Sequence, residues 1–168
     1  MRLSILFPCV LGLALGNPVL AQNTPASAAS TAAPVLAANP GYDAELAKKA
    51  GANENGMRKY VFVILKSGPN KIPAGTERDD MFKGHFANIK KMAESGKLAV
   101  AGPLDGKEGR RGIFVLLVDD IEEARKLVEQ DPVIVKGEMV ADYHMLFASA
   151  ALALIPELHS KVQKKAMF

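Results

Sequence analysis

Apolar residues follow first a strand-like and then a helix-like pattern in the middle of the chain. The run Lys59–Lys66 (KYVFVILK) is rich in β-branched and aromatic residues, which is typical of a buried strand. Between Thr76 and Gly96, apolar residues recur at steps of three and four, which predicts a long helix with one buried face. We expect that face to carry Phe82, His85, Phe86, Ile89, Met92 and Ala93.

The segments that follow repeat the alternation of strands and helices. Asp120, with Glu123 three residues later, favours the start of a second helix, Ile121–Gln130. Asp131 ends this helix, because the residue before a proline is driven out of the helical region. The polar segment Leu104–Gly112 has the composition of a hairpin connection. Further strands are expected at Lys97–Ala101, Ile113–Val118 and Glu138–Phe147. A short helix is expected from Asp43, its candidate N-cap, to Ala50, and a C-terminal helix from Ser149 that Pro156 interrupts.

The order strand, helix, strand, strand, helix, strand predicts an α+β fold, a ferredoxin-like βαββαβ sandwich with an extra C-terminal helix. Helices cover one face of such a sheet. The last strand carries apolar residues on both of its sides, Met139, Ala141, Tyr143 and Met145 on one and Val140 and Leu146 on the other, so the face without helices is too apolar to stay in water. We therefore expect a homodimer that buries this open face.

The first 21 residues have the three-part pattern of a secretory signal peptide. Arg2 is followed by the mostly apolar run Leu3–Leu20 and by a small-residue cleavage site that ends at Ala21. Glycine and proline break this run, and a helix that spans a membrane needs about 20 apolar residues, so a cleaved signal is favoured. The alternative is an uncleaved membrane anchor. Cleavage would remove Cys9, the single cysteine. We expect a periplasmic or secreted protein without stable membrane insertion after cleavage.

The folded part is expected to begin after a linker. Residues 22–40 are rich in Ala, Ser and Pro and carry no charge, which is typical of a disordered tether. Residues 41–168 then form one α+β domain with flanking helices. The formal charge of the chain is +3, its charged residues are of mixed sign, and it has no Trp. No basic groove with stacking aromatic side chains is evident, so nucleic-acid binding is not expected.

His85 is the strongest candidate for chemistry, because a titratable ring on a buried helix face needs a partner or a role. Imidazole often acts as a general base. The alternative is a core histidine bonded to a backbone carbonyl. The neighbouring Gly84 costs roughly 1 kcal/mol in a helix relative to alanine, which fits a close approach of a backbone or ligand there. Asp131 could orient the His85 ring, because the two helices lie side by side in this topology, or it could be only a turn former.

Three further residues are candidates for substrate binding. Gly102 and Pro103 end the second strand, where small residues could form a pocket wall or simply a strand-terminating turn. His144 lies on the last strand and shares one face of it with Asp142. His144 could join the pocket, or the two residues could form a structural polar cluster.

Motifs for other chemistries are missing from the sequence. The three histidines have no ligand-like spacing and no supporting Cys or Glu motif, so a metal site is not expected. The sequence has no dinucleotide-binding or phosphate-binding glycine motif and no G-x-S-x-G elbow. We therefore expect neither a metal nor an organic cofactor.

Three segments of the chain form a pattern that is found together in one family. They are HFANIKKMAESGKLAVAGPL, RGIFVLLVDDIEEARKLVEQDP and the strand that ends in YHMLF. With them the chain resembles the YCII-related (YciI-like) domain family over residues 58–147. The resemblance implies a dimeric α+β barrel and a histidine–aspartate active site, which falls on His85 and Asp131. It also implies isomerase or lyase chemistry on small cyclic or conjugated compounds.

Two functional hypotheses follow, and the sequence leaves open whether the chain is an enzyme. The first is a cofactor-free lyase or isomerase that moves a proton with His85, assisted by Asp131. The second is a non-catalytic ligand-binding or stress-related module that uses the same cleft for a small molecule. A purely structural dimer would not explain a histidine on an apolar helix face. The substrate cannot be identified from these residues.

Overall fold

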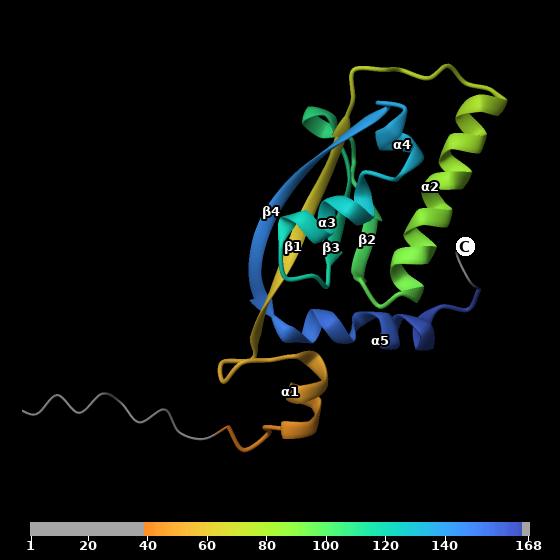
Figure 1. Cartoon of the computed structure of the whole chain (residues 1–168). Helices are drawn as coiled ribbons and strands as arrows, with labels where there is room; N and C mark the ends of the chain where they lie inside the picture. Colours follow the sequence, from red (N-terminus) through yellow and green to blue (C-terminus); the bar gives the residue numbers. More distant parts are fainter. Residues whose placement is uncertain (1–38, 166–168) are drawn as a thin grey trace, which may run out of the picture. The chain divides into compact units, whose positions relative to one another are not determined.

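The computed structural model describes residues 39–165 (Figure 1). The predicted signal peptide, with Cys9, and residues 22–38 of the predicted linker lie outside them. The elements in chain order are α1 (Ala44–Ala50), β1 (Met57–Ser67), α2 (Thr76–Glu94), β2 (Leu98–Pro103), the 3-10 turn η1 (Lys107–Gly109), β3 (Arg110–Leu116), α3 (Ile121–Val128), α4 (Pro132–Val135), β4 (Met139–Ser149), the 3-10 segment η2 (Ala150–Leu154) and α5 (Ile155–Val162).

The four strands form one antiparallel sheet in the order β2-β3-β1-β4. The central strand β1 pairs on both sides, so that Val63 lies opposite Phe114 of β3 and Tyr143 of β4. Helix α2 connects β1 to β2, and α3 with α4 connects β3 to β4. This is the βαββαβ arrangement, and the predicted ferredoxin-like α+β sandwich is confirmed.

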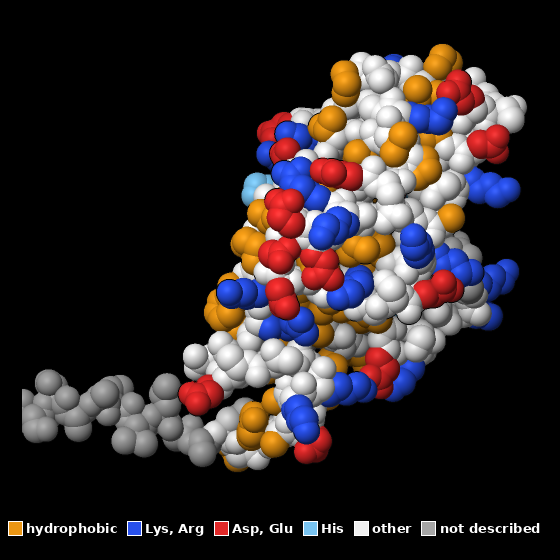
Figure 2. Space-filling model, viewed as in Figure 1, with side chains coloured by type: hydrophobic (Ala, Val, Ile, Leu, Met, Phe, Trp, Pro, Cys, Tyr) orange, Lys and Arg blue, Asp and Glu red, His pale blue; other side chains and the backbone are white. Residues whose placement is uncertain are grey.

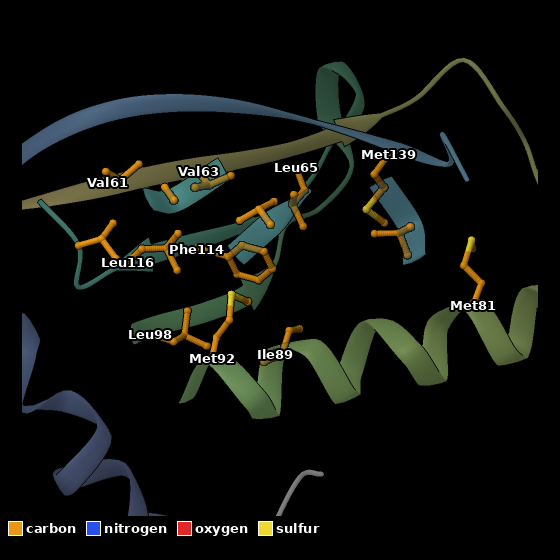
Figure 3. Close-up of a cluster of buried hydrophobic side chains, with 14 residues drawn as sticks. Val61, Val63, Leu65, Met81, Ile89, Met92, Leu98, Phe114, Leu116 and Met139 are labelled. Atoms are coloured by element: carbon orange, nitrogen blue, oxygen red, sulfur yellow. The ribbon is translucent and has the colours of Figure 1, made fainter. Parts of the chain in front are cut away.

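The main core lies between the sheet and helices α2 to α4. Alternate residues of each strand point to the helices, and side chains of α2 point back toward them (Figure 3). The side chains at the centre are at most 2% exposed: Val61, Val63, Met81, Met92, Phe114 and Leu116. This packing fixes the face that α2 turns to the sheet.

The buried face of α2 is rotated relative to the predicted one. Met81, which was not predicted to be buried, is 2% exposed, whereas Phe86 is 47% exposed and Ala93 is also exposed. Met81, His85 and Met92 lie on the side of α2 that faces the sheet. The residue after each of them is turned by about 100° around the helix axis and therefore lies at the edge of the buried side. The buried residues of α2 are Met81, His85, Asn88, Ile89 and Met92.

Side-chain caps start the helices largely as predicted. Asp43 accepts a hydrogen bond from the Leu46 amide at 2.9 Å, and Asp120 accepts one from the Glu123 amide at 2.7 Å. Asp131 caps a further helix, the short α4, which the sequence analysis did not predict. Pro132 fits the first position of that helix, where its missing N–H would have no partner. Pro156 likewise lies in the first turn of α5 and does not interrupt it.

Helices α2 and α4 approach each other closely at Gly84. A Cβ atom placed on Gly84 would lie 2.7 Å from Cγ of Pro132, whose ring cannot swing away. The close approach that the glycine predicted is therefore present, with a proline ring as the neighbour. This contact sets the position of α2 against the segment that carries Asp131.

The loop between β1 and α2 is held by the buried carboxylate of Glu138. This carboxylate accepts hydrogen bonds from the Ile72 amide at 2.7 Å and from the Arg78 guanidinium at 2.9 Å. The Ile72 hydrogen bond and the Arg78 charge lower the pKa of Glu138, against the opposing effect of burial. Glu138 thereby ties the start of α2 to the start of β4.

The second face of the sheet carries a smaller apolar cluster. Tyr60, Ala99 and Val115 are buried there, and Leu152 of η2 packs against them. The Tyr60 hydroxyl donates a hydrogen bond to the Ser149 carbonyl at 2.9 Å, which holds the start of η2. Val140, on the same face of β4, is 38% exposed. The segment after β4 therefore covers only part of this face.

Charged side chains of both signs are interspersed over the face of the molecule seen in Figure 2. Within residues 39–165, every helix is too short or too polar to cross a lipid bilayer.

We predict that Gly84→Ala destabilises the protein. Helix propensity alone would make this substitution stabilising by about 1 kcal/mol, because alanine is favoured over glycine in a helix. Because the added methyl group would overlap the Pro132 ring, we expect a net loss of about 1–3 kcal/mol in urea unfolding. A gain in stability would contradict the close approach of α2 and α4.

We predict that Glu138→Gln lowers the free energy of unfolding at neutral pH and makes that free energy less dependent on pH in the acidic range. The folded-state pKa of Glu138 is below the unfolded value of about 4.3, so its contribution is present above that pH and is lost as the pH falls through the folded pKa. We expect a loss of about 1–3 kcal/mol at pH 7 in urea unfolding. The matched control is Glu94→Gln, whose side chain is 66% exposed. Equal acid dependence in wild type and Glu138→Gln would refute this role.

Candidate functional site

His85 and Asp131 meet in the space between α2 and α4. Nδ1 of His85 lies 2.8 Å from Oδ2 of Asp131. The two residues are 8% and 1% exposed, so the contact is largely shielded from water. The predicted contact between these two side chains is present, and its part in catalysis stays a prediction.

The carboxylate of Asp131 has three hydrogen-bond donors. Besides the His85 ring, the Asn88 amide group donates to Oδ2 at 3.2 Å, and the Val133 backbone amide donates to Oδ1 at 3.1 Å. The same Asn88 group also donates to the Leu127 carbonyl at 3.2 Å, at the end of α3. A buried carboxylate needs such partners, since its transfer from water is otherwise very unfavourable.

The contact defines the roles of the two ring nitrogens of His85. An ionised carboxylate can only accept hydrogen bonds, so Nδ1 carries the hydrogen in its bond to Asp131. In the neutral ring, Nε2 then has a free lone pair and can accept a proton. A carboxylate in this position can fix the tautomer of an imidazole and stabilise its protonated form, which is the geometry that a general base requires.

Three phenylalanine rings surround the imidazole. The ring centroids of Phe82, Phe86 and Phe114 lie 6.1, 5.5 and 6.3 Å from that of His85. Phe82 and Phe86 come from α2, and Phe114 comes from the facing strand β3. The imidazole is therefore placed among flat apolar surfaces.

Sequence analysis missed Asn88, which joins the three elements around the site. Asn88 could have been identified from its position three residues after His85, because this places it on the same buried face of α2, where a side-chain amide needs hydrogen-bond partners. The distance between Asn88 and Asp131 could not be predicted, because α4 was not expected and the approach of α2 to it depends on Gly84.

The structure does not bring His144 to His85. His144 pairs with Phe62 of β1, on the sheet face opposite the helices, whereas Val61 and Val63 point toward α2 to α4. Asp142 lies on the same face as His144 but forms an ion pair with Lys66, at 2.7 Å.

Gly102 and Pro103 end β2 as predicted, and a Cβ atom on Gly102 would meet nothing within 4 Å. A groove of about 510 Å³ borders the same strand but is lined by its residues 98–101 and not by these two. The binding roles of Gly102, Pro103 and His144 stay predictions.

Tyr143 lies on the helix-covered face of the sheet but offers little for acid–base chemistry near neutral pH. Burial raises the pKa of Tyr143 to about 12, so its hydroxyl keeps its proton near neutral pH. Its ring lies under the Arg125 guanidinium, 4.6 Å from the ring centroid. Within the part of the chain that the structure describes, no three His, Cys, Asp or Glu side chains are grouped so that they could hold a metal ion.

Comparison with known proteins places the chain in a family. No curated protein matches it. A solved structure that the comparison matches is that of 5-chloro-2-hydroxyhydroquinone dehydrochlorinase from Burkholderia phenoliruptrix AC1100, in complex with 2,5-dihydroxybenzoquinone. It is 20% identical, with a TM-score of 0.34, and the match covers 52% of this chain and 90% of that one. The model of the YCII-related domain matches residues 59–146, which include His85, Asn88 and Asp131. The chain therefore belongs to the YCII-related domain family.

Proposed function

We propose that this protein binds a small cyclic or conjugated molecule beside His85 and transfers a proton on it, as a cofactor-free lyase or isomerase. The observation that carries the proposal is the 2.8 Å contact between the His85 ring and the buried Asp131 carboxylate. It supports the proposal because it leaves the second ring nitrogen as an oriented base.

The proposed reaction begins when Nε2 of His85 takes a proton from a carbon next to a carbonyl group. The electron pair of the C–H bond moves into the conjugated system, and Asp131 stabilises the imidazolium. In an isomerase, the imidazolium returns the proton to a different carbon. In a lyase, the electron pair expels a leaving group as an anion from the neighbouring carbon, and the imidazolium gives its proton to the departing group or to water. Neither course needs an oxidant or a second substrate.

The surroundings of His85 support a flat, conjugated substrate. The partly exposed rings of Phe82 and Phe86 offer aromatic surfaces on which such a molecule can pack, while the buried Phe114 ring backs the imidazole from the sheet. Phe86 is 47% exposed, so this side of the site borders solvent.

The main competitor is a ligand-binding module that uses the same residues without turnover. Asp131 also caps α4 and accepts a hydrogen bond from Asn88, and these contacts would be useful in a protein with no catalytic role. The two functions differ in whether a carbon-bound proton is exchanged, which can be measured without knowing the natural substrate.

We predict that the wild-type protein catalyses deuterium exchange at carbon in D2O on cyclohex-2-enone or 2(5H)-furanone, followed by proton NMR. The variant His85→Gln should lower this rate by about 10²- to 10⁴-fold, since it keeps an N–H donor for Asp131 but cannot take up a proton. Asp131→Asn should lower it by a smaller factor, because the ring loses its fixed tautomer. The control is Lys83→Ala, an exposed position on α2.

Two results would reject the enzyme proposal. One is exchange in wild type that does not exceed the buffer rate for either probe. The other is an unchanged rate in His85→Gln with the fold intact. Chemical-shift changes around His85 on addition of a probe, without exchange, would favour the binding module.

We further propose that the protein is a homodimer through the open face of its sheet. Phe62, Ile64 and Ile113 lie on that face and are only partly buried in the single chain, and Val140 is exposed. We predict a dimer mass in light scattering at micromolar concentration, and a shift to monomer in Ile64→Glu but not in Ala87→Glu on the outer side of α2. A monomeric wild type would exclude the dimer.

We also propose that the protein is exported, which the sequence pattern of residues 1–21 supports. We predict that the mature protein begins at Gln22 and is found in the periplasmic or extracellular fraction. Intact-mass measurement of the exported protein decides this, and a mass that includes residues 1–21 would reject cleavage.

A further inference from the structure

The C-terminal helix α5 lies outside the residues that match the family model, yet it forms one wall of a groove. The family match ends at residue 146, and α5 spans Ile155–Val162. The groove has a volume of about 510 Å³, within the range of about 300–1,000 Å³ that is usual for small-molecule sites. It runs between α2, the edge strand β2 and α5.

The walls of the groove are aliphatic. The groove is lined by Ile89 and Ala93 of α2, by Leu98, Val100 and Ala101 of β2, and by Ile155 and Pro156 of α5. No aromatic ring other than the His159 imidazole is among the lining side chains. The groove therefore differs in character from the phenylalanine-lined surroundings of His85.

Polar groups stand among these walls, and most of them are hydrogen-bond donors. Lys90, His159 and Gln163 each offer an N–H group, whereas Glu94 is the one carboxylate. Lys90 and Glu94 are 4.0 Å apart, a loose pair of exposed side chains. No side chain among residues 39–165 forms a hydrogen bond with the His159 ring. An anionic group on a ligand would therefore find donors from both α2 and α5.

Helix α5 and the η2 segment that precedes it are both tied to the rest of the protein. The Ala150 amide donates to the Gly56 carbonyl at 2.8 Å, and Leu152 packs on the apolar cluster of the open sheet face. Glu157 forms an ion pair with Lys49 of α1, which lowers the pKa of Glu157. The wall is thus formed by α5, which α1 supports from outside the groove, and both helices lie outside the residues that match the family model.

We propose that this groove is a second small-molecule site, specific for compact aliphatic or alicyclic carboxylates. The hydrocarbon part lies between α2, β2 and Ile155, and the carboxylate meets the donors of Lys90, His159 and Gln163. This proposal does not depend on proton transfer by His85.

The test is a titration of the ¹⁵N-labelled protein with cyclohexanecarboxylate, observed by NMR. The amides of Ala93, Ala101 and His159 should shift together and saturate. Ala93→Leu should weaken binding by about tenfold, because the larger side chain fills the groove. Ala87→Leu, the same change at an exposed position of α2 outside the groove, should bind within about twofold of wild type.

A second pair of variants tests the contribution of α5. His159→Ala should weaken cyclohexanecarboxylate binding several-fold, and Leu158→Ala, on the exposed side of the same helix, should not. Cyclohexylamine, which has the same ring but the opposite charge, should cause no saturable shifts at the groove.

Three results would overturn the proposal. They are the absence of saturable shifts in the groove, equal binding by Ala93→Leu and wild type, and groove shifts that follow protein concentration and not the probe. The last result would assign the groove to a second copy of the chain.

Discussion

The carboxylate of Asp131 is 1% exposed, and the arrangement of the site depends on how it is satisfied. Two of its three hydrogen-bond donors, the His85 ring and the Asn88 side-chain amide, come from α2, and the third, the Val133 backbone amide, comes from α4. Loss of any one would leave part of a buried charge without a partner, at a cost of about 1–3 kcal/mol or more. The same bonds that hold α2 against α4 therefore also orient the imidazole.

Close packing of the backbone makes these bonds attainable. Gly84 allows the Pro132 ring to approach α2, and the capping geometry of Asp131 turns its carboxylate back toward that helix. On the opposite side, Phe114 of the sheet packs beside the His85 ring. The imidazole is thus enclosed by a helix, a strand and a helix cap, which limits the orientations that it can adopt.

Much of the fold could be predicted from the sequence because its signals are local. The strand and helix periods, the caps at Asp43 and Asp120, and the proline after Asp131 act within a few residues of one another. The wrong predictions concern elements whose presence or bounds depend on contacts between residues far apart in the sequence. Helix α4 is only four residues long, too short for a periodic pattern, and β3 begins at Arg110 because pairing with β1 extends it into the expected loop.

The candidate site shows the same division. His85 and Asp131 were predicted from a buried polar position, the topology and the family resemblance, but Asn88 was not, since its role depends on the distance between two helices. His144 could not be assigned from alternation alone, because the sequence does not say which face of β4 the helices cover. Phe86 and Ala93 were expected to be buried, although a helix that packs on a single sheet leaves the edges of its apolar stripe exposed.

The tautomer of His85 tests the central claim most directly. ¹⁵N chemical shifts of the imidazole, recorded at a pH where the ring is neutral, report which nitrogen carries the hydrogen. The account predicts that Nδ1 is protonated and Nε2 is not, and that Asp131→Asn disturbs this preference. A neutral ring protonated at Nε2 in the wild-type protein would contradict it, because His85 could then neither donate to Asp131 nor present a free base to a substrate.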